Sequence, residues 1–162
     1  MIGRILLAGA FSLASITAAS AAESKLTLPA KPQLTLAAAQ AIADAATQYA
    51  AAQGWTGSVA VVDAAGYPIL VNKMDGATAI SAELAVRKGK TSALFGVAST
   101  NMEKRINEGG PALLALGFTT LAGGQPIVVD KQVIGAVGVS TAVGAHDDPI
   151  AVQASHALDG KL

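Results

Sequence analysis

Between residue 34 and Gly54, hydrophobic residues recur at about every third or fourth position, which is the spacing of one face of a helix. This pattern predicts an amphipathic helix with Thr35 as its N-cap and Gly54 at its C-terminal end. The pattern then changes to two β-branched runs, at residues 58–63 and 67–73. Because only a short Ala-Ala-Gly turn separates these runs, they are predicted to form a β-hairpin.

Two further helices are predicted in the middle of the chain. Residues 80–95 have helical spacing, with Thr78 or Ser81 as the N-cap. Gly89 lies inside this helix, and an interior glycine indicates close packing against another element. The Thr-Asn-Met-Glu sequence that begins at Thr100 is a capping box, so it predicts a short polar helix that ends at the next Gly-Gly-Pro.

The last third of the chain is predicted to contain strands and one closing helix. Residues 113–121 are predicted as one strand, and residues 126–129 and 133–140 as a second hairpin. Asp148 suits the N-cap of the closing helix, and the proline after it suits the first helical position. Strands joined by tight turns run antiparallel, so the expected fold is α+β, with an antiparallel sheet of about five strands flanked by helices.

The N-terminus is expected to be a signal peptide. Arg4 gives a short basic start, residues 5–17 are mainly apolar, and Ala19 and Ala21 are the small residues that a signal peptidase reads. Cleavage is expected after Ala21, with Ala22 as the second choice. An uncleaved membrane anchor is the alternative, but the apolar run is shorter than the ~20 residues that span a bilayer.

The expected organisation follows from this cleavage site. Residues 1–21 form the signal peptide, residues 22–33 an extended N-terminal arm, and residues 34–162 a single domain. The mature protein is therefore expected in the periplasm or secreted.

The composition excludes several kinds of partner and chemistry. The 162 residues include 11 basic and 11 acidic side chains and no cysteine. A near-neutral chain without a polybasic stretch has no electrostatic surface for nucleic acid or for a membrane. Without cysteine, a thiolate nucleophile and any metal or haem attachment through cysteine are excluded. Such a domain depends on its core for stability, with oligomerisation as a further source.

Nucleophilic catalysis and metal binding find little support in the sequence. The chain has two histidines, His146 and His156, and it lacks a Gly-x-Ser-x-Gly motif. His146 is followed by Asp147 and Asp148, but helix capping explains both carboxylates better than a metal site does. No catalytic residue is assigned, and the metal remains unknown.

A polar corner at the end of the first hairpin is the best candidate for a binding site. Met74 and Asp75 leave the second strand there, and Lys88 and Lys90 lie on the next helix. Asp75 is expected to accept hydrogen bonds from the free amides at the start of that helix, with Tyr67 close to the corner. The other interpretation is that Asp75 only turns the chain and that the lysines are solvated.

An ordered series of segments resembles the GlcG/HbpS family, which includes exported haem-binding proteins and the C-terminal domain of PduO-type proteins. The segments are Val-Val-Asp-Ala-Ala-Gly, Lys-Met-Asp-Gly-Ala, Lys-Gly-Lys-Thr-Ser, Gly-Gly-Gln-Pro-Ile and Val-Ile-Gly-Ala-Val-Gly-Val-Ser. Their order and spacing carry the resemblance over nearly all of the mature chain.

This resemblance implies a homo-oligomer that binds haem or a related tetrapyrrole. The site residues that it implies are Tyr67, Lys73, Met74, Asp75, Lys88, Lys90 and Thr100. The lysines would pair with the haem propionates, while the tyrosine, the methionine or the threonine would lie near the metal. Tyr67 stands where the family commonly has histidine; a tyrosine phenol ligates ferric haem in catalase, but Tyr67 also suits a simple strand position.

Two other functions stay open beside haem binding. One is a small enzyme that acts on haem or an organic acid, with Asp75 and a lysine as its acid and base. The other is a non-catalytic accessory domain of an exported redox or sensor system. Whether the protein is an enzyme is therefore undecided by the sequence, with binding alone favoured.

Overall fold

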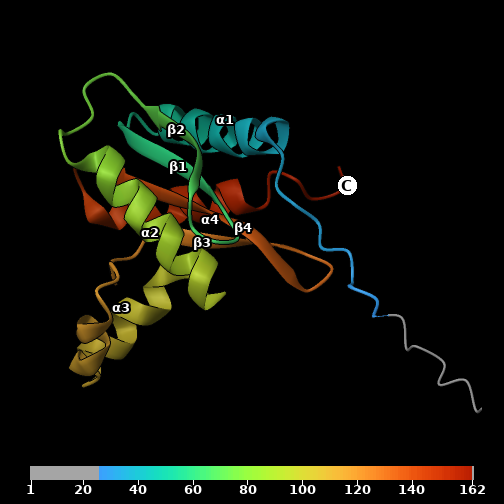
Figure 1. Cartoon of the computed structure of the whole chain (residues 1–162). Helices are drawn as coiled ribbons and strands as arrows, with labels where there is room; N and C mark the ends of the chain where they lie inside the picture. The colour runs from blue at the N-terminus through green and yellow to red at the C-terminus, as the bar shows by residue number, and fades with distance from the viewer. Residues whose placement is uncertain (1–25, 162) are drawn as a thin grey trace, which may run out of the picture.

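The structure is a computed structural model that describes residues 26–161. Its elements follow the order α1 (Leu36–Ala52), β1 (Gly57–Asp63), β2 (Pro68–Lys73), α2 (Ser81–Phe95), α3 (Ser99–Asn107), the 3-10 helix η1 (Pro111–Leu116), β3 (Gly124–Val129), β4 (Gln132–Thr141), the 3-10 helix η2 (Gly144–His146) and α4 (Asp147–Ser155). The expected α+β fold is confirmed (Figure 1). The signal peptide and its cleavage site lie outside the described residues.

The four strands form one sheet in the order β2-β1-β4-β3, and every neighbouring pair is antiparallel. Both expected hairpins are present, β1–β2 and β3–β4. The strands β1 and β4, which are far apart in the sequence, pair at the centre of the sheet from Gly57 opposite Thr141 to Asp63 opposite Gly135. The sheet therefore contains four strands rather than about five.

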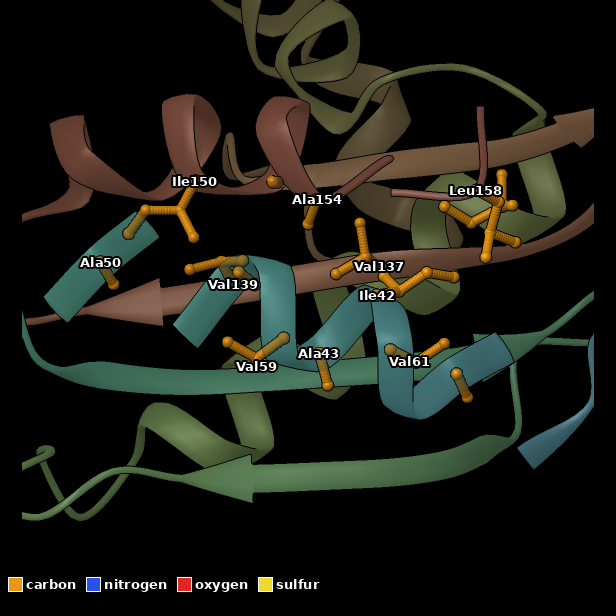
Figure 2. Close-up of a cluster of buried hydrophobic side chains, with 14 of the residues drawn as sticks. Ile42, Ala43, Ala50, Val59, Val61, Val137, Val139, Ile150, Ala154 and Leu158 are labelled. Carbon is orange, nitrogen blue, oxygen red and sulfur yellow. The ribbon is translucent and has the colours of Figure 1, made fainter. Parts of the chain in front are cut away.

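Helices cover both faces of this sheet. Figure 2 shows α1 and α4 packed on one face, where Val59 and Val61 of β1 and Val137 and Val139 of β4 are buried. Small side chains on α1 and α4 let these helices approach the valines closely: Ala39, Ala43, Ala46, Ala50, Ala151 and Ala154. The other face carries α2, and α3 with η1 extends beyond it, away from α1 (Figure 1).

At Gly89 the backbone of α2 lies directly against the sheet, while Ala93 of the same helix packs with Val62 and Ala136 of the strands. A Cβ atom on Gly138 of β4 would lie 2.5 Å from the backbone nitrogen of Gly89 on α2, which leaves no space for a side chain there. The expectation that Gly89 marks close packing is therefore confirmed. Successive helical residues differ by about 100°, so Lys88 and Lys90 leave α2 on opposite flanks of this contact.

The predicted strand over residues 113–121 is wrong. Pro111 begins the 3-10 helix η1, and Gly117 ends it in the left-handed conformation, with a φ of 72°. The carbonyls of Thr119 and Leu121 accept hydrogen bonds from the hydroxyls of Thr91 and Ser99. The backbone of this segment is thus bound to helix side chains instead of to a strand.

Of the predicted N-caps, only that of Thr35 is confirmed, since its hydroxyl accepts a hydrogen bond from the amide of Ala38 at 3.2 Å. The other three are wrong: the helices α2, α3 and α4 follow Ile80, Ala98 and His146, and none of these residues makes a side-chain capping bond. The side chains of Ser81, Thr100 and Asp148 instead bind partners on other elements of the fold.

The segment that precedes α1 has neither helix nor strand from residue 26 to residue 35. Residues 26–33 are exposed along it. Within residues 26–161, helices that combine the length and the hydrophobicity needed to cross a bilayer are absent.

Candidate functional site

The residues that the sequence assigns to a site fall into three separate places. Tyr67 and Lys90 come together at one end of β2. Lys88 and Thr100 both bind the first turn of α4. Lys73, Met74 and Asp75 lie at the other end of β2, about 20 Å from Tyr67 at the usual rise of a strand. The expectation that Tyr67 lies close to the corner of Asp75 is therefore wrong.

Tyr67 and Lys90 form a cation–aromatic pair on the surface. The Lys90 ammonium lies 6.0 Å from the centroid of the Tyr67 ring, at the limit of a cation–π contact. Tyr67 is 68% exposed, and Lys90 is also exposed. Both side chains are therefore accessible to a ligand.

The turn between β1 and β2 fixes this pair. One carboxylate oxygen of Asp63 accepts hydrogen bonds from the amides of Ala65 and Tyr67, each at 2.9 Å. Gly66 has a φ of 81°, and a Cβ atom on it would lie 2.6 Å from Cγ of Lys90. The stem of Lys90 therefore packs across Gly66, and this contact directs its ammonium towards Tyr67.

A small hollow lies beside Lys90. Its volume is about 160 Å³, and Arg87, Lys90, Gly117, Phe118 and Thr119 line it. The ring of Phe118 meets that of Phe95 edge to face, with centroids 5.2 Å apart. The Arg87 guanidinium is 3.4 Å from the Glu83 carboxylate, and both side chains are at least half exposed. We call Arg87, Lys90, Tyr67 and Phe118 the Tyr67–Lys90 surface.

Sequence reasoning missed two members of this surface. Arg87 is three residues before Lys90 on a predicted helix, so their shared face was readable from the sequence. Phe118 lies in the segment that was predicted as a strand, and nothing in the local sequence places it beside α2. Its position follows from η1 and from the hydrogen bond between Thr91 and the Thr119 carbonyl.

Lys88 has an internal partner. Its ammonium is 2.5 Å from a carboxylate oxygen of Asp147, and the two side chains are 4% and 2% exposed. The other oxygen of Asp147 accepts hydrogen bonds from the amide and the hydroxyl of Thr141, each at 2.7 Å. Because Asp147 neutralises it inside the fold, Lys88 is not a free cation.

Asp148 also binds tertiary partners. One of its carboxylate oxygens accepts hydrogen bonds from the Thr100 hydroxyl at 2.7 Å and from the Gln125 amide at 2.9 Å. The interpretation of Asp147 and Asp148 as helix caps is therefore wrong. A hollow of about 280 Å³ adjoins this network, lined by Lys88, Glu103, Leu121, Ala122, Gly144, Ala145 and Asp148.

The corner at the end of β2 is held by backbone groups. The carbonyl of Asp75 accepts a hydrogen bond from the Thr56 hydroxyl at 2.6 Å. Among residues 26–161, no donor binds the exposed carboxylate of Asp75, so the expected bonds to helix amides are not formed. Met74 is half-buried against the main core, and α2 begins only at Ser81. The corner is thus a turn that is separated from the helix.

Each of the two histidines contacts another side chain. His146 stacks on Trp55 with ring centroids 3.9 Å apart, and His156 is exposed and 2.9 Å from the Asp159 carboxylate. In the part of the chain that the structure describes, groups of three or more histidine, aspartate or glutamate side chains placed to hold a metal are absent.

The buried ion pair generates a stability prediction. Lys88→Met leaves the Asp147 carboxylate buried without its counter-ion, so the free energy of unfolding is expected to fall by about 3–5 kcal/mol. The matched change Arg87→Met removes an exposed pair one residue away and is expected to cost less than about 1 kcal/mol. Urea unfolding followed by circular dichroism measures both, and equal losses would contradict the role of the Lys88–Asp147 pair.

Comparison with known proteins gives one consistent result. Residues 34–156 match the family model described as "Haem degrading protein HbpS-like". Protein GlcG of Escherichia coli K12 is 38% identical over 103 residues, which are 63% of this chain and 77% of GlcG. A double mutant of Streptomyces reticuli HbpS superposes with a TM-score of 0.75 at 32% identity, over 91% of this chain and 99% of that one.

A second similar structure is a complex of PduOC with haem, which has a TM-score of 0.71 at 25% identity. It covers 79% of this chain and 96% of that one. The family match spans three quarters of the sequence, and the fold agrees with it over most of the described residues. The chain therefore belongs to the HbpS-like family.

Proposed function

We propose that the protein binds haem or a related tetrapyrrole at the Tyr67–Lys90 surface. The family membership supports the ligand class, and a similar structure is described as a haem complex. One observation supports the location: two exposed cations, Arg87 and Lys90, line the same hollow as Phe118, with the Tyr67 ring beside the Lys90 ammonium. Haem is an apolar ring that carries carboxylates, so its site needs aromatic side chains and cations together.

The residues of this surface fit each part of a haem. Phe118 offers an aromatic face for the macrocycle, and the two cations offer donors for its propionates. The Tyr67 hydroxyl binds no other group within residues 26–161, and a tyrosine phenolate is an established ligand of ferric haem. Bound haem would supply a redox-active iron at this place.

The structure narrows the set of residues that the sequence suggested. Lys88 is neutralised by Asp147, and Thr100 donates its hydroxyl to Asp148. Lys73 and Asp75 lie at the far end of β2, and Met74 packs on the core. The proposed site therefore keeps Tyr67 and Lys90 and gains Arg87 and Phe118.

Binding is better supported than catalysis. The enzymatic alternative required Asp75 to act with a lysine as acid and base. No ion pair joins Asp75 to a lysine within residues 26–161, and Lys90 is at the opposite end of β2. The accessory-domain alternative predicts no haem binding, so the titration below separates it from the proposal.

Haem titration tests the site. Lys90→Met and Arg87→Met are each expected to weaken haem binding about tenfold, because each removes one charge-assisted contact to a propionate. Tyr67→Phe is expected to change the Soret and charge-transfer bands, because the phenol oxygen is the proposed ligand. The control is Lys104→Met on α3, an exposed lysine that pairs with Glu108, and its titration is expected to match the wild type. If Lys90→Met, Arg87→Met and Tyr67→Phe all titrate like the wild type, the site is elsewhere.

We also propose that a second copy of the chain completes the site. The hollow of about 160 Å³ is smaller than the ~300 Å³ at which small-molecule pockets usually begin, so this surface covers only part of a tetrapyrrole. Exposed apolar side chains lie on α2, on η1 and in the segment after η1, the parts of the chain that carry this hollow: Leu94, Phe95, Leu114, Leu116 and Leu121. An apolar surface beside an incomplete ligand site favours association of copies.

Light scattering after size exclusion tests this assembly. The wild type is expected to be a homo-oligomer, and Leu114→Glu, at a side chain 56% exposed on η1, is expected to shift it towards the monomer. Val152→Glu is the matched control, because Val152 is 40% exposed on α4, on the other face of the sheet. A wild-type monomer at micromolar concentration, or equal effects of the two variants, would refute the proposal.

Finally, we propose that the protein is exported to the periplasm or secreted. The support is the basic, apolar and small-residue pattern of residues 1–21. Cell fractionation followed by N-terminal sequencing is expected to find a chain that begins at Ala22 or Glu23 outside the cytoplasm. A cytoplasmic species that still begins at Met1 would show the proposal to be wrong.

A further inference from the structure

A second hollow, of about 370 Å³, lies at the opposite face of the β1–β2 turn from the surface described above. It is lined by Lys31, Pro32, Gln33, Leu34, Asp63, Ala64, Ala65, Ile69 and Ile134. Its volume falls within the ~300–1,000 Å³ range of small-molecule pockets, whereas the hollows beside Lys88 and Lys90 are smaller. We call it the arm pocket, because residues 31–33 of the N-terminal arm, together with Leu34, form one wall.

Two β-bulges supply the apolar floor of the arm pocket. Val61 pairs with Leu70 and Val62 with Pro68, so Ile69 is the extra residue of a bulge in β2. In the same way, Gly135 pairs with Ile127 and Val133 with Val128, which leaves Ile134 as the extra residue in β4. Bulges redirect side chains, and they are common beside binding sites.

Both bulges turn an isoleucine towards the same space. Strict alternation from Val137, which faces α1, would place Ile134 on the α2 side of the sheet. Ile134 instead belongs to the core cluster on the α1 side, and Ile69 packs against that cluster. The bulges in β2 and β4, which are not neighbouring strands, thus both place an isoleucine in one hollow at the end of β1.

The arm closes the hollow from outside. A Cβ atom on Gly135 would lie 2.9 Å from a methyl carbon of Leu34, so Leu34 is pressed against the backbone of β4. The next residue, Thr35, caps α1 and fixes where the arm ends. The wall is therefore attached at its C-terminal end, next to the floor isoleucines.

The rim carries one charge of each sign. Lys31 is exposed on the arm, and it has an ammonium without an ion-pair partner among residues 26–161. Asp63 lines the same pocket, with one carboxylate oxygen bonded to two turn amides. A ligand that bears both an anionic and a cationic group matches this rim, while its apolar part would contact Ile69 and Ile134.

We propose that the arm pocket binds a small aliphatic zwitterion, the class that a free branched-chain amino acid represents. The carboxylate of the ligand pairs with Lys31, its ammonium with Asp63, and its branched side chain fills the floor. This site is independent of the haem proposal, because none of its lining residues belongs to the Tyr67–Lys90 surface.

Isothermal titration with L-leucine, in the absence of haem, tests the proposal. The comparison ligands are 4-methylpentanoate, which lacks the ammonium, and 3-methylbutylamine, which lacks the carboxylate. L-Leucine is expected to bind, and each comparison ligand to bind at least about tenfold more weakly, because each loses one charged contact. Absence of leucine binding, or equal binding of either comparison ligand, would overturn the proposal.

Variants locate the binding and separate the two sites. Lys31→Met is expected to weaken leucine binding about tenfold, whereas the control Lys104→Met on α3 leaves it unchanged. Since Lys31 is exposed, this change does not threaten folding. Tyr67→Phe is expected to alter the haem spectrum but not leucine binding, so either proposal can fail alone. Equal leucine affinities in Lys31→Met and Lys104→Met would refute the assignment to this pocket.

Discussion

The close approach of α2 to strand β4 is the constraint on which the rest of the structure depends. Gly89 meets Gly138 with no side chain between them, and the absence of Cβ atoms brings the helix backbone down onto the sheet. Close packing of this kind leaves no room for the residues on either side of Gly89 to point at the sheet. Lys88 and Lys90 are therefore placed on opposite flanks of α2. Lys88 forms a buried ion pair with Asp147, and Lys90 is exposed and accessible to a ligand.

On the Lys88 flank, polar side chains connect helices to the end of the sheet. Ser81 at the start of α2 contacts the Ser58 hydroxyl at 2.7 Å, and Ser99 at the start of α3 accepts a hydrogen bond from the Gly124 amide. Together with the Lys88–Asp147 pair, these bonds satisfy groups that burial would otherwise make unfavourable. The polar interior is thus a scaffold, and its charges are neutralised internally.

On the Lys90 flank, one turn serves both proposed sites. Asp63 lines the arm pocket, and the same carboxylate accepts the amide hydrogen bond of Tyr67. Gly66, between them, gives the Lys90 stem its place over the turn. Residues 63–67 of this turn therefore set the positions of three side chains that belong to the two proposed sites, Asp63, Tyr67 and Lys90.

Local patterns in the sequence determined the helices, both hairpins and the Thr35 cap, because each depends on residues a few positions apart. The fold class followed from them. The tertiary structure decided what Lys88, Thr100 and Asp148 do, since their partners are 23 to 59 residues away in the chain. The same short polar residues that cap helices also bind distant groups, and local sequence does not distinguish the two uses. The segment at residues 113–121 shows the same limit, because its backbone found hydroxyl partners on α2 and α3 where its composition predicted a strand.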